Sequence, residues 1–226
     1  MRRFVVPMVA VAALIVSLTC ACSTAAKKGF TPSDEDVSRV PRAPATPASA
    51  SKPGDAPDPG MEVIIVGPRM RVLIDWPAGL EADRLAMMRA FTDTYTAGWK
   101  AVVTGGKDDS YRVSVQDDAI LEAGAWVRGF VDVRASARGV ARVYALRVPS
   151  VTGRGAEVDA CVDESGVRLT DAATGRLATE QPSWTRRPEA IRLQIAGVRR
   201  GDDDKWRVKA FQHVNYPHEA AKECAR

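Results

Sequence analysis

The sequence predicts an α+β domain in which helices pack on one face of a curved antiparallel sheet. Two observations lead to this fold class. Between Leu80 and Phe130 apolar residues recur every three or four positions, as they do along one face of an α-helix. From Arg142 to Val214 they alternate with polar residues, as they do in half-buried strands. We therefore expect helices first and an antiparallel meander second.

The first 21 residues are typical of a secretory signal peptide and are excluded from the fold. Arg2 and Arg3 precede an apolar run from Phe4 to Leu18, and small residues follow the run. The run is too short to span a bilayer comfortably, since that takes about 20 apolar residues. We expect residues 1–21 to be removed on export.

The stretch from Leu18 to Ser23 resembles the cleavage box of bacterial lipoproteins. Cys22 follows the small residue Ala21 and is favoured over Cys20 as the first residue of the mature chain. We expect Cys22 to carry the lipid, with its palmitate or similar acyl chains, and to hold the protein at the extracellular face of the cell membrane. The alternative is a soluble secreted protein that is cut near Ala21 or Ala25.

Residues 22–60 differ in composition from the rest of the chain. Seven of the 14 prolines fall between residues 23 and 60, and Phe30 is the only aromatic residue there. Such a segment cannot bury enough apolar surface to offset the entropy of ordering it. We expect the lipidated cysteine to be followed by a disordered tether rich in Pro, Ala and Ser, and residues 61–226 to form a single domain.

The domain is predicted to begin with a loose hairpin and a long helix. Glu62–Val66 and Arg71–Trp76 are β-branched runs on either side of Gly67-Pro68, which predicts two short strands. From Leu80 the spacing becomes helical, and Gly105-Gly106 predicts the end of this helix. Its expected apolar face consists of Leu85, Met88, Tyr95, Trp99 and Val102, with Phe91 at the edge.

A second helix is predicted after the polar residues 107–110. Ser114, followed by Asp117 three residues later, is typical of a helix N-cap with its first-turn acid. We expect the apolar stripe of this helix to consist of Ala119, Ala123, Trp126 and Phe130.

Beyond Gly139 the apolar period drops to two, and glycines or the run Asp202–Asp204 separate the successive segments. The predicted strands are Arg142–Val148, Ala156–Val162, Val167–Thr170, Ala190–Val198 and Lys205–Val214. On these strands, the positions expected to face inward are apolar: Val158, Ala160, Val162, Ile191, Leu193 and Ile195.

Several short motifs follow one another in a recognisable order: Tyr95 and Trp99 with Ala101, then Thr104-Gly105, the strand Ala156–Asp163, Trp206-Arg207-Val208 and Cys224. In this order they resemble a family of uncharacterised secreted proteins and lipoproteins of high-GC actinobacteria. The resemblance covers about residues 80–224 and implies an NTF2-like fold, a cone of curved sheet closed by helices, with no established activity. The sequence departs from the family pattern at Ala160, where an aspartate is common, and in the segment Gln181–Pro188.

The cysteines agree with an extracellular location. Cys20 leaves with the signal peptide and Cys22 takes the lipid, so Cys161 and Cys224 remain as a pair in an oxidising compartment. A structural disulfide between them would close a loop of about 63 residues and contribute roughly 4 kcal/mol in the chain-entropy model. Two free thiols and a redox-active pair are the alternatives, although redox pairs normally lie close in sequence.

Few residues are candidates for catalysis or metal binding. His213 and His218 lie near Glu219, and a histidine with a carboxylate can act as a general base, but we expect both to be exposed residues near the chain end. Nucleophile-elbow, phosphate-loop and dinucleotide motifs are missing from the sequence. We therefore expect no enzymatic activity and no cofactor.

Two groups of acids also lack the spacing of a calcium loop. Asp159, Asp163 and Glu164 surround Cys161, and we expect them to lie on solvated faces. Asp202–Asp204 predicts a hairpin turn, because aspartate accepts local backbone hydrogen bonds. We expect no metal site.

The loop between Pro182 and Pro188 is the best candidate for contact with a partner. It carries Trp184, Arg186 and Arg187, and tryptophan and arginine dominate interface hot spots. A surface loop held by its prolines is the alternative. By contrast, Trp99 and Trp126 lie on helical stripes and are expected to pack in the core.

Charge argues against a nucleic-acid partner. The net charge is +4, and removal of Arg2 and Arg3 leaves 30 basic and 28 acidic residues, a net of +2, with no run of five basic residues.

Since the predicted interior is apolar, we expect a non-catalytic, membrane-tethered module that binds an envelope protein or assembles in the envelope. The alternative is a small-ligand-binding protein or an enzyme that uses the interior of the cone.

Overall fold

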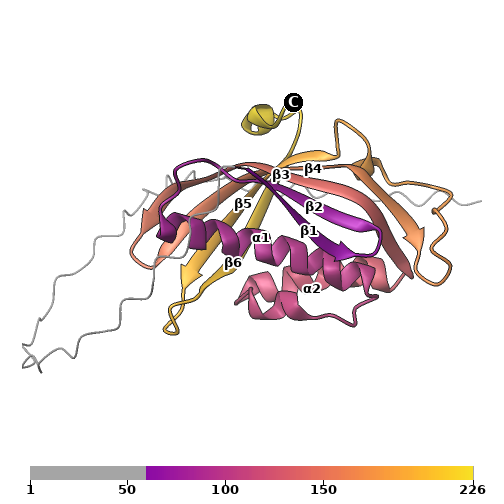
Figure 1. Cartoon of the computed structure of the whole chain (residues 1–226), viewed down its shortest axis with the longest axis horizontal. Helices are drawn as coiled ribbons and strands as arrows, with labels where there is room; N and C mark the ends of the chain where they lie inside the picture. The colour runs from indigo at the N-terminus through magenta and orange to yellow at the C-terminus, as the bar shows by residue number, and fades with distance from the viewer. Residues whose placement is uncertain (1–59, 226) are drawn as a thin grey trace, which may run out of the picture. The chain divides into compact units, whose positions relative to one another are not determined.

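The computed structural model describes residues 60–225, which form a six-stranded sheet with two α-helices against one of its faces (Figure 1). The strands lie in the order β1-β2-β3-β4-β5-β6, so each strand pairs with its neighbours in sequence. The pairing of β2 with β3 is parallel, and the other four pairings are antiparallel. The α+β class is confirmed, but the sheet is mixed and not wholly antiparallel as predicted, because the two helices carry the chain from β2 to its parallel neighbour β3.

The predicted signal peptide, Cys22 and nearly all of the predicted tether lie outside the described residues. Within residues 60–225, no helix has the length and apolar character that a membrane span requires.

The first hairpin is confirmed. It joins β1 (Met61–Gly67) to β2 (Met70–Asp75) by antiparallel pairing around Gly67-Pro68. Ile64 pairs with Val72, and Val72 belongs to the core beneath the helices. We call this side of the sheet the helix face and the opposite side the outer face.

Helix α1 (Ala82–Val103) lies along the helix face and leads, with α2 (Asp118–Val131), from β2 to its parallel neighbour β3 (Figure 1). The predicted apolar face is correct: the side chains of Met88, Phe91, Trp99 and Val102 are buried, and Leu85 and Tyr95 pack against the same core. The helix ends where predicted, because Gly105 and Gly106 both have positive φ.

The start of α2 differs from the prediction. Asp117, not Ser114, is the N-cap residue, and the hydroxyl of Ser114 donates to the carbonyl of Tyr111 in the 3₁₀ turn η1 (Ser110–Val113). The backbone explains the difference, since the Ser114 carbonyl accepts from the Val208 N–H and the Gln116 N–H donates to the Val208 carbonyl. Backbone hydrogen bonds between this segment and the edge strand therefore take the place of the N-cap that Ser114 was predicted to provide.

Strands β3 (Ala135–Thr152) and β4 (Gly155–Asp171) are longer than predicted. Two predicted strands, Ala156–Val162 and Val167–Thr170, are parts of β4, and Gly166 lies within it opposite Val140. A Cβ at Gly139, which has φ 112°, would lie 2.1 Å from the carbonyl oxygen of Gly166. These glycines permit a close approach of the two strand backbones. In a sequence, a glycine with this role looks the same as a glycine in a turn, so the strands were predicted too short.

The last two strands are β5 (Ile191–Arg200) and β6 (Trp206–Asn215). The predicted turn at Asp202–Asp204 is confirmed, since the Gly201 N–H donates to the Lys205 carbonyl across it.

The prediction of inward-facing residues is correct for β4 and wrong for β5. Ala160 pairs with Gln194 and Val162 pairs with Arg192, so Arg192 and Gln194 share the helix face with the apolar side chains of β4. Ile191, Leu193 and Ile195 therefore lie on the outer face, where they pack around Cys161. When the phase of alternation is assigned one residue out, every side chain of the strand is assigned to the wrong face of the sheet.

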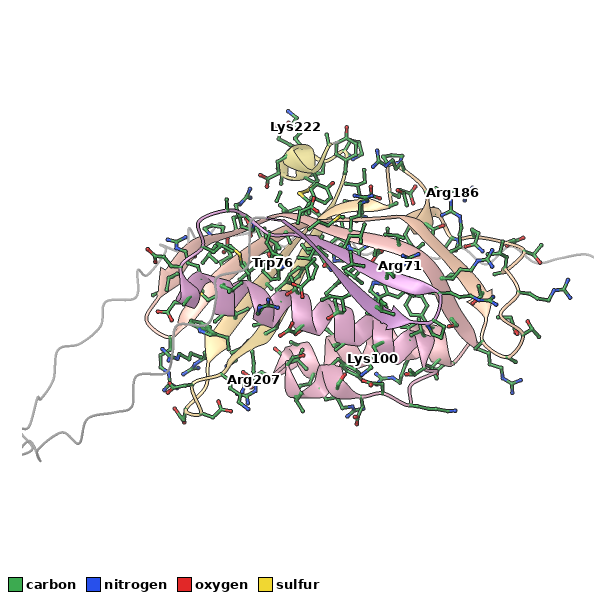
Figure 2. All side chains as sticks on the ribbon, in the orientation of Figure 1. Arg71, Trp76, Lys100, Arg186, Arg207 and Lys222 are labelled. Carbon is green, nitrogen blue, oxygen red and sulfur yellow. A yellow bond between two sulfur atoms is a disulfide. The ribbon has the colours of Figure 1, made fainter. Side chains whose placement is uncertain are left out.

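The C-terminal turn η3 (Glu219–Cys224) covers part of the outer face, on the side of the sheet opposite α1 (Figure 1). Lys222 marks this segment in Figure 2. A disulfide joins Cys224 to Cys161 of β4, and the hydroxyl of Tyr144 donates to the Cys224 carbonyl at 2.5 Å. Ala221 and Cys224 are buried there with Leu193.

We expect Gly139→Ala to destabilise the domain by about 2 to 4 kcal/mol, because the added methyl combines positive φ with a backbone clash. Gly129 of α2 is the matched control, since nothing lies within 4 Å of a Cβ built there. Gly129→Ala should stabilise by about 0.5 to 1 kcal/mol through helix propensity. Urea unfolding midpoints measure both effects, and equal midpoints for the two variants would contradict the close-approach interpretation.

Candidate functional site

A pocket of about 200 Å³ opens on the helix face between α1, α2, β5 and β6. Aromatic side chains form much of its wall, and polar groups come from both helices and both strands. The lining residues are Phe91, Thr94, Tyr95, Gly98, Tyr111, Glu122, Ala123, Trp126, Arg192, Gln194, Phe211 and His213.

The two helices approach each other closely at the pocket because α1 carries a glycine there. A Cβ at Gly98 would lie 3.2 Å from Cζ3 of Trp126 on α2. The Trp126 ring meets Trp99 edge to face, with centroids 5.1 Å apart. Trp126 nevertheless stays 36% exposed, which differs from the core position predicted for it.

Beside the pocket lies a buried polar cluster of Tyr95, Glu164 and Arg192. Arg192 donates to both oxygens of Glu164, from Nη1 to Oε2 at 2.6 Å and from Nη2 to Oε1 at 2.8 Å. The hydroxyl of Tyr95 donates to Oε1 at 2.7 Å. Glu164 is only 2% exposed, so this two-pronged pair is held in a poorly solvated interior.

Glu164 lies two residues after Val162, so the regular alternation of β4 places it on the helix face, and an irregularity follows it. Val140 pairs with Gly166 and Arg142 pairs with Asp163, so Glu164 and Ser165 together face the single residue Ala141. This is the arrangement of a β-bulge, in which one extra residue shifts the alternation of the strand beyond it. No local sequence signal predicts it.

The cluster favours one protonation state. Burial, together with the nearby charge of Glu164, raises the pKa of Tyr95 well above its ordinary value. For Arg192, burial opposes the charge, but the Glu164 carboxylate outweighs it and holds the pKa above the ordinary value. The cluster is therefore a neutral phenol beside an ion pair with no net charge.

The prediction that the three acids around Cys161 are solvated is wrong. Asp159, Asp163 and Glu164 are all buried, and each pairs with an arginine: Arg147, Arg187 and Arg192 respectively. Burial works against the charge of Asp163, but hydrogen bonds from Ser165 and the Arg187 guanidinium hold its pKa below the usual value. Long-range pairing with arginines from other segments explains the difference.

These acids do not form a metal site. Across residues 60–225, no group of three or more His, Cys, Asp or Glu side chains is arranged to hold a metal ion. Asp163 turns to the outer face beside Arg187, whereas Glu164 turns to the helix face beside Arg192.

Both histidines are exposed, as predicted. His213 lies exposed on β6 and lines the pocket. His218 is the exposed N-cap residue of η3, where its Nδ1 accepts from the Ala220 N–H at 3.1 Å. Glu219 pairs instead with Lys222.

Only part of the loop predicted to contact a partner is exposed to solvent. Trp184, in the short turn η2 (Ser183–Thr185), is half-buried, and its ring lies 6.4 Å from that of Trp99 and 6.0 Å from that of Phe130. It contributes to the core. Arg186 and Arg187 remain exposed, with Arg187 paired to Asp163, so contact with a partner through this loop stays a prediction for the two arginines.

A second candidate site lies on the outer face at β1, which sequence reasoning did not single out. Met61, Val63 and Ile65 are 56%, 48% and 74% exposed and lie on one face of the strand. Leu73 extends this apolar surface onto β2, where it pairs with Val63. Arg71, labelled in Figure 2, lies opposite Ile65. We call Met61, Val63 and Ile65 the β1 stripe.

Comparison with protein-family models and with curated proteins finds no match. Among solved structures, the intermembrane space region of the chloroplast protein ARC6 is similar, with 12% sequence identity and a TM-score of 0.41. The alignment covers 60% of this chain and 99% of that one. A likeness at this level carries no argument about function.

We expect Arg192→Met to destabilise the domain by about 3 to 5 kcal/mol, because it leaves the Glu164 charge buried without its partner. Replacing both groups, by Arg192→Met with Glu164→Leu, should cost less than the single change. Urea unfolding measures each variant. Arg142→Met, at an exposed arginine on the outer face, is the control and should stay within about 0.5 kcal/mol. A single Arg192 variant as stable as this control would refute the assigned pairing.

Proposed function

We propose that this protein is a non-catalytic, membrane-tethered assembly module of the cell envelope that associates with a second copy through strand β1. The observation that carries the proposal is the exposed β1 stripe on the edge of the sheet. Cys22 supplies the lipid anchor in this proposal, and residues 22–60 supply the tether. The sheet that curves over two helices supports an NTF2-like cone for the folded part.

The interior polar groups support binding over catalysis. Glu164 is the buried carboxylate nearest to the pocket residues Tyr95 and Arg192, and both of these donate to it. A general base needs a free acceptor within reach of a substrate proton. Three of the roughly four acceptor positions of the Glu164 carboxylate are already occupied, and its side chain is buried, so it offers little to a substrate proton.

The two edges of the sheet are protected differently. At β6, the Val208 backbone both donates to Ser114 and accepts from Gln116, and Lys209 pairs with Asp117. Among residues 60–225, no segment pairs with the outer edge of β1, and β1 contains neither proline nor lysine. An open apolar edge of this kind is a template for another strand.

A second copy fits this edge by symmetry. If two β1 strands pair antiparallel about Ile64, Val63 of one copy lies opposite Ile65 of the other, and the two β1 stripes merge into one apolar surface. The only charged residue of β1, Glu62, lies on the other face, where it accepts from Trp76 Nε1 at 2.7 Å. No like charges oppose each other in this register.

A charge-swap experiment tests the proposed register. Two differently tagged copies of the full-length protein are produced in the same cells, solubilised in detergent and isolated through one tag. We expect wild-type copies to be recovered together and Val63→Glu copies to separate, as should Ile65→Lys copies, because each change places a charge against an apolar side chain. A Val63→Glu copy should associate with an Ile65→Lys copy, since positions 63 and 65 then form an ion pair.

Leu121→Lys provides the control, because Leu121 is an equally exposed apolar residue on α2 and should not affect recovery. Equal recovery of all combinations would show that detergent or lipid, and not β1, holds the copies together. Recovery of no combination would show that the second copy is not the partner. Either result refutes the proposal.

Cys22→Ser tests the anchor separately. We expect the wild-type chain to take up a fatty-acid analogue during growth and the Cys22→Ser chain to remain unlabelled, because the thiol forms the thioether to the lipid. Cys20→Ser serves as the control and should label normally. A Cys22→Ser protein that still labels would refute Cys22 as the anchor without affecting the β1 experiment.

A further inference from the structure

We propose that the pocket on the helix face binds a small, uncharged aromatic molecule that carries a hydrogen-bond donor. This site lies on the opposite face from the β1 stripe, so the inference goes beyond the proposed self-association and does not depend on it. Three properties of the pocket lead to it: its walls, its charge and one polar atom without a partner.

The walls suit a flat apolar body. Phe91 and Tyr95 come from successive turns of α1, Trp126 comes from α2 and Phe211 comes from β6. Aromatic side chains favour stacked or edge-to-face contact with another ring. A volume of about 200 Å³ is below the range of about 300 to 1,000 Å³ of drug-sized sites, so one ring or a fused pair of rings is the appropriate size.

The charges of the pocket favour an uncharged molecule. Arg192 directs two of its N–H groups at Glu164, so the pair brings no net charge to the site. Glu122 lies at the pocket and opposes an anion. A cation would meet only Glu122, an exposed side chain whose charge is screened by solvent, since the buried Glu164 is already bound by Arg192 and Tyr95.

The unpartnered atom favours a donor on the bound molecule. Gln194 lines the pocket from β5, and its Oε1 is buried without a hydrogen-bond donor among the described residues. A buried acceptor left unpaired is costly, so a molecule that supplies an N–H or O–H group recovers that cost on binding. Thr94, by contrast, is satisfied, since its hydroxyl donates to the carbonyls of Ala90 and Ser114.

Indole and 1-methylindole are the matched probes, because they share one ring system and differ at the N–H donor. Calorimetric titration of the full-length lipoprotein in detergent measures binding of each. We expect indole to bind at least about fivefold more tightly than 1-methylindole. Since both probes also enter detergent, each titration is compared with the Ala123→Leu chain in the same detergent, where the added side chain fills the pocket and abolishes binding.

Gln194→Met tests the role of the amide oxygen. It keeps the length of the side chain and removes the acceptor, so the two probes should then bind equally. Gln212→Met is the control: Gln212 is an exposed residue of β6 and pairs with Ile195, which lies on the outer face, and its replacement should preserve the difference. Unfolding midpoints confirm that each variant is folded.

Several outcomes would overturn the proposal. The site is not a ligand pocket if indole gives no more heat with the wild-type chain than with the Ala123→Leu chain. Equal affinity of the wild-type chain for the two probes, or an unchanged difference in Gln194→Met, would show that Gln194 does not select a donor. None of these results bears on whether the chain associates through β1.

Discussion

The ion pair of Arg192 and Glu164, with the Tyr95 hydroxyl that donates to it, joins the helix layer of this fold to the sheet. Glu164 lies on β4 and Arg192 on β5, and Tyr95 of α1 donates to the same carboxylate. One buried acid therefore links the long helix to the centre of the sheet. Burial makes the pair sensitive to the loss of either partner, because an isolated charge in the interior is strongly unfavourable. This contact adds a polar link to the apolar packing of Met88, Phe91 and Trp99, which holds α1 on the sheet beside the pocket.

The helices and the first hairpin could be predicted because their signals are local. The spacing of Met88, Phe91 and Trp99 and the Gly105-Gly106 stop describe α1 without reference to the rest of the chain. The cap of α2 could not be predicted in the same way, since a backbone contact with the distant residue Val208 decides it. Local sequence propensity is enough to identify a helix or strand, whereas contacts with distant residues decide where it begins and ends.

The candidate site was harder to predict than the fold because it depends on register. The sequence shows alternation along β5 but not which phase faces the helices, and apolar residues occupy both faces of this strand. Ile191 and Leu193 were expected inside, whereas the pairing of β4 with β5 places Arg192 and Gln194 there. The bulge that follows Glu164 adds a second shift, because it changes the phase of alternation within β4. Both features depend on pairing between strands, which a single sequence does not display.

The two ends of the described chain are attached with different strength. Residue 60 leads directly into β1, an edge strand held to the sheet through β2, whereas the C-terminal turn is covalently joined to β4 by Cys161 and Cys224. A mechanical load applied from the N-terminal side would act first on the β1–β2 hydrogen bonds, which can separate one pair at a time. Because the disulfide fixes the C-terminal turn to β4, a force between the two ends of the described chain would separate β1 from β2 before it displaced that turn.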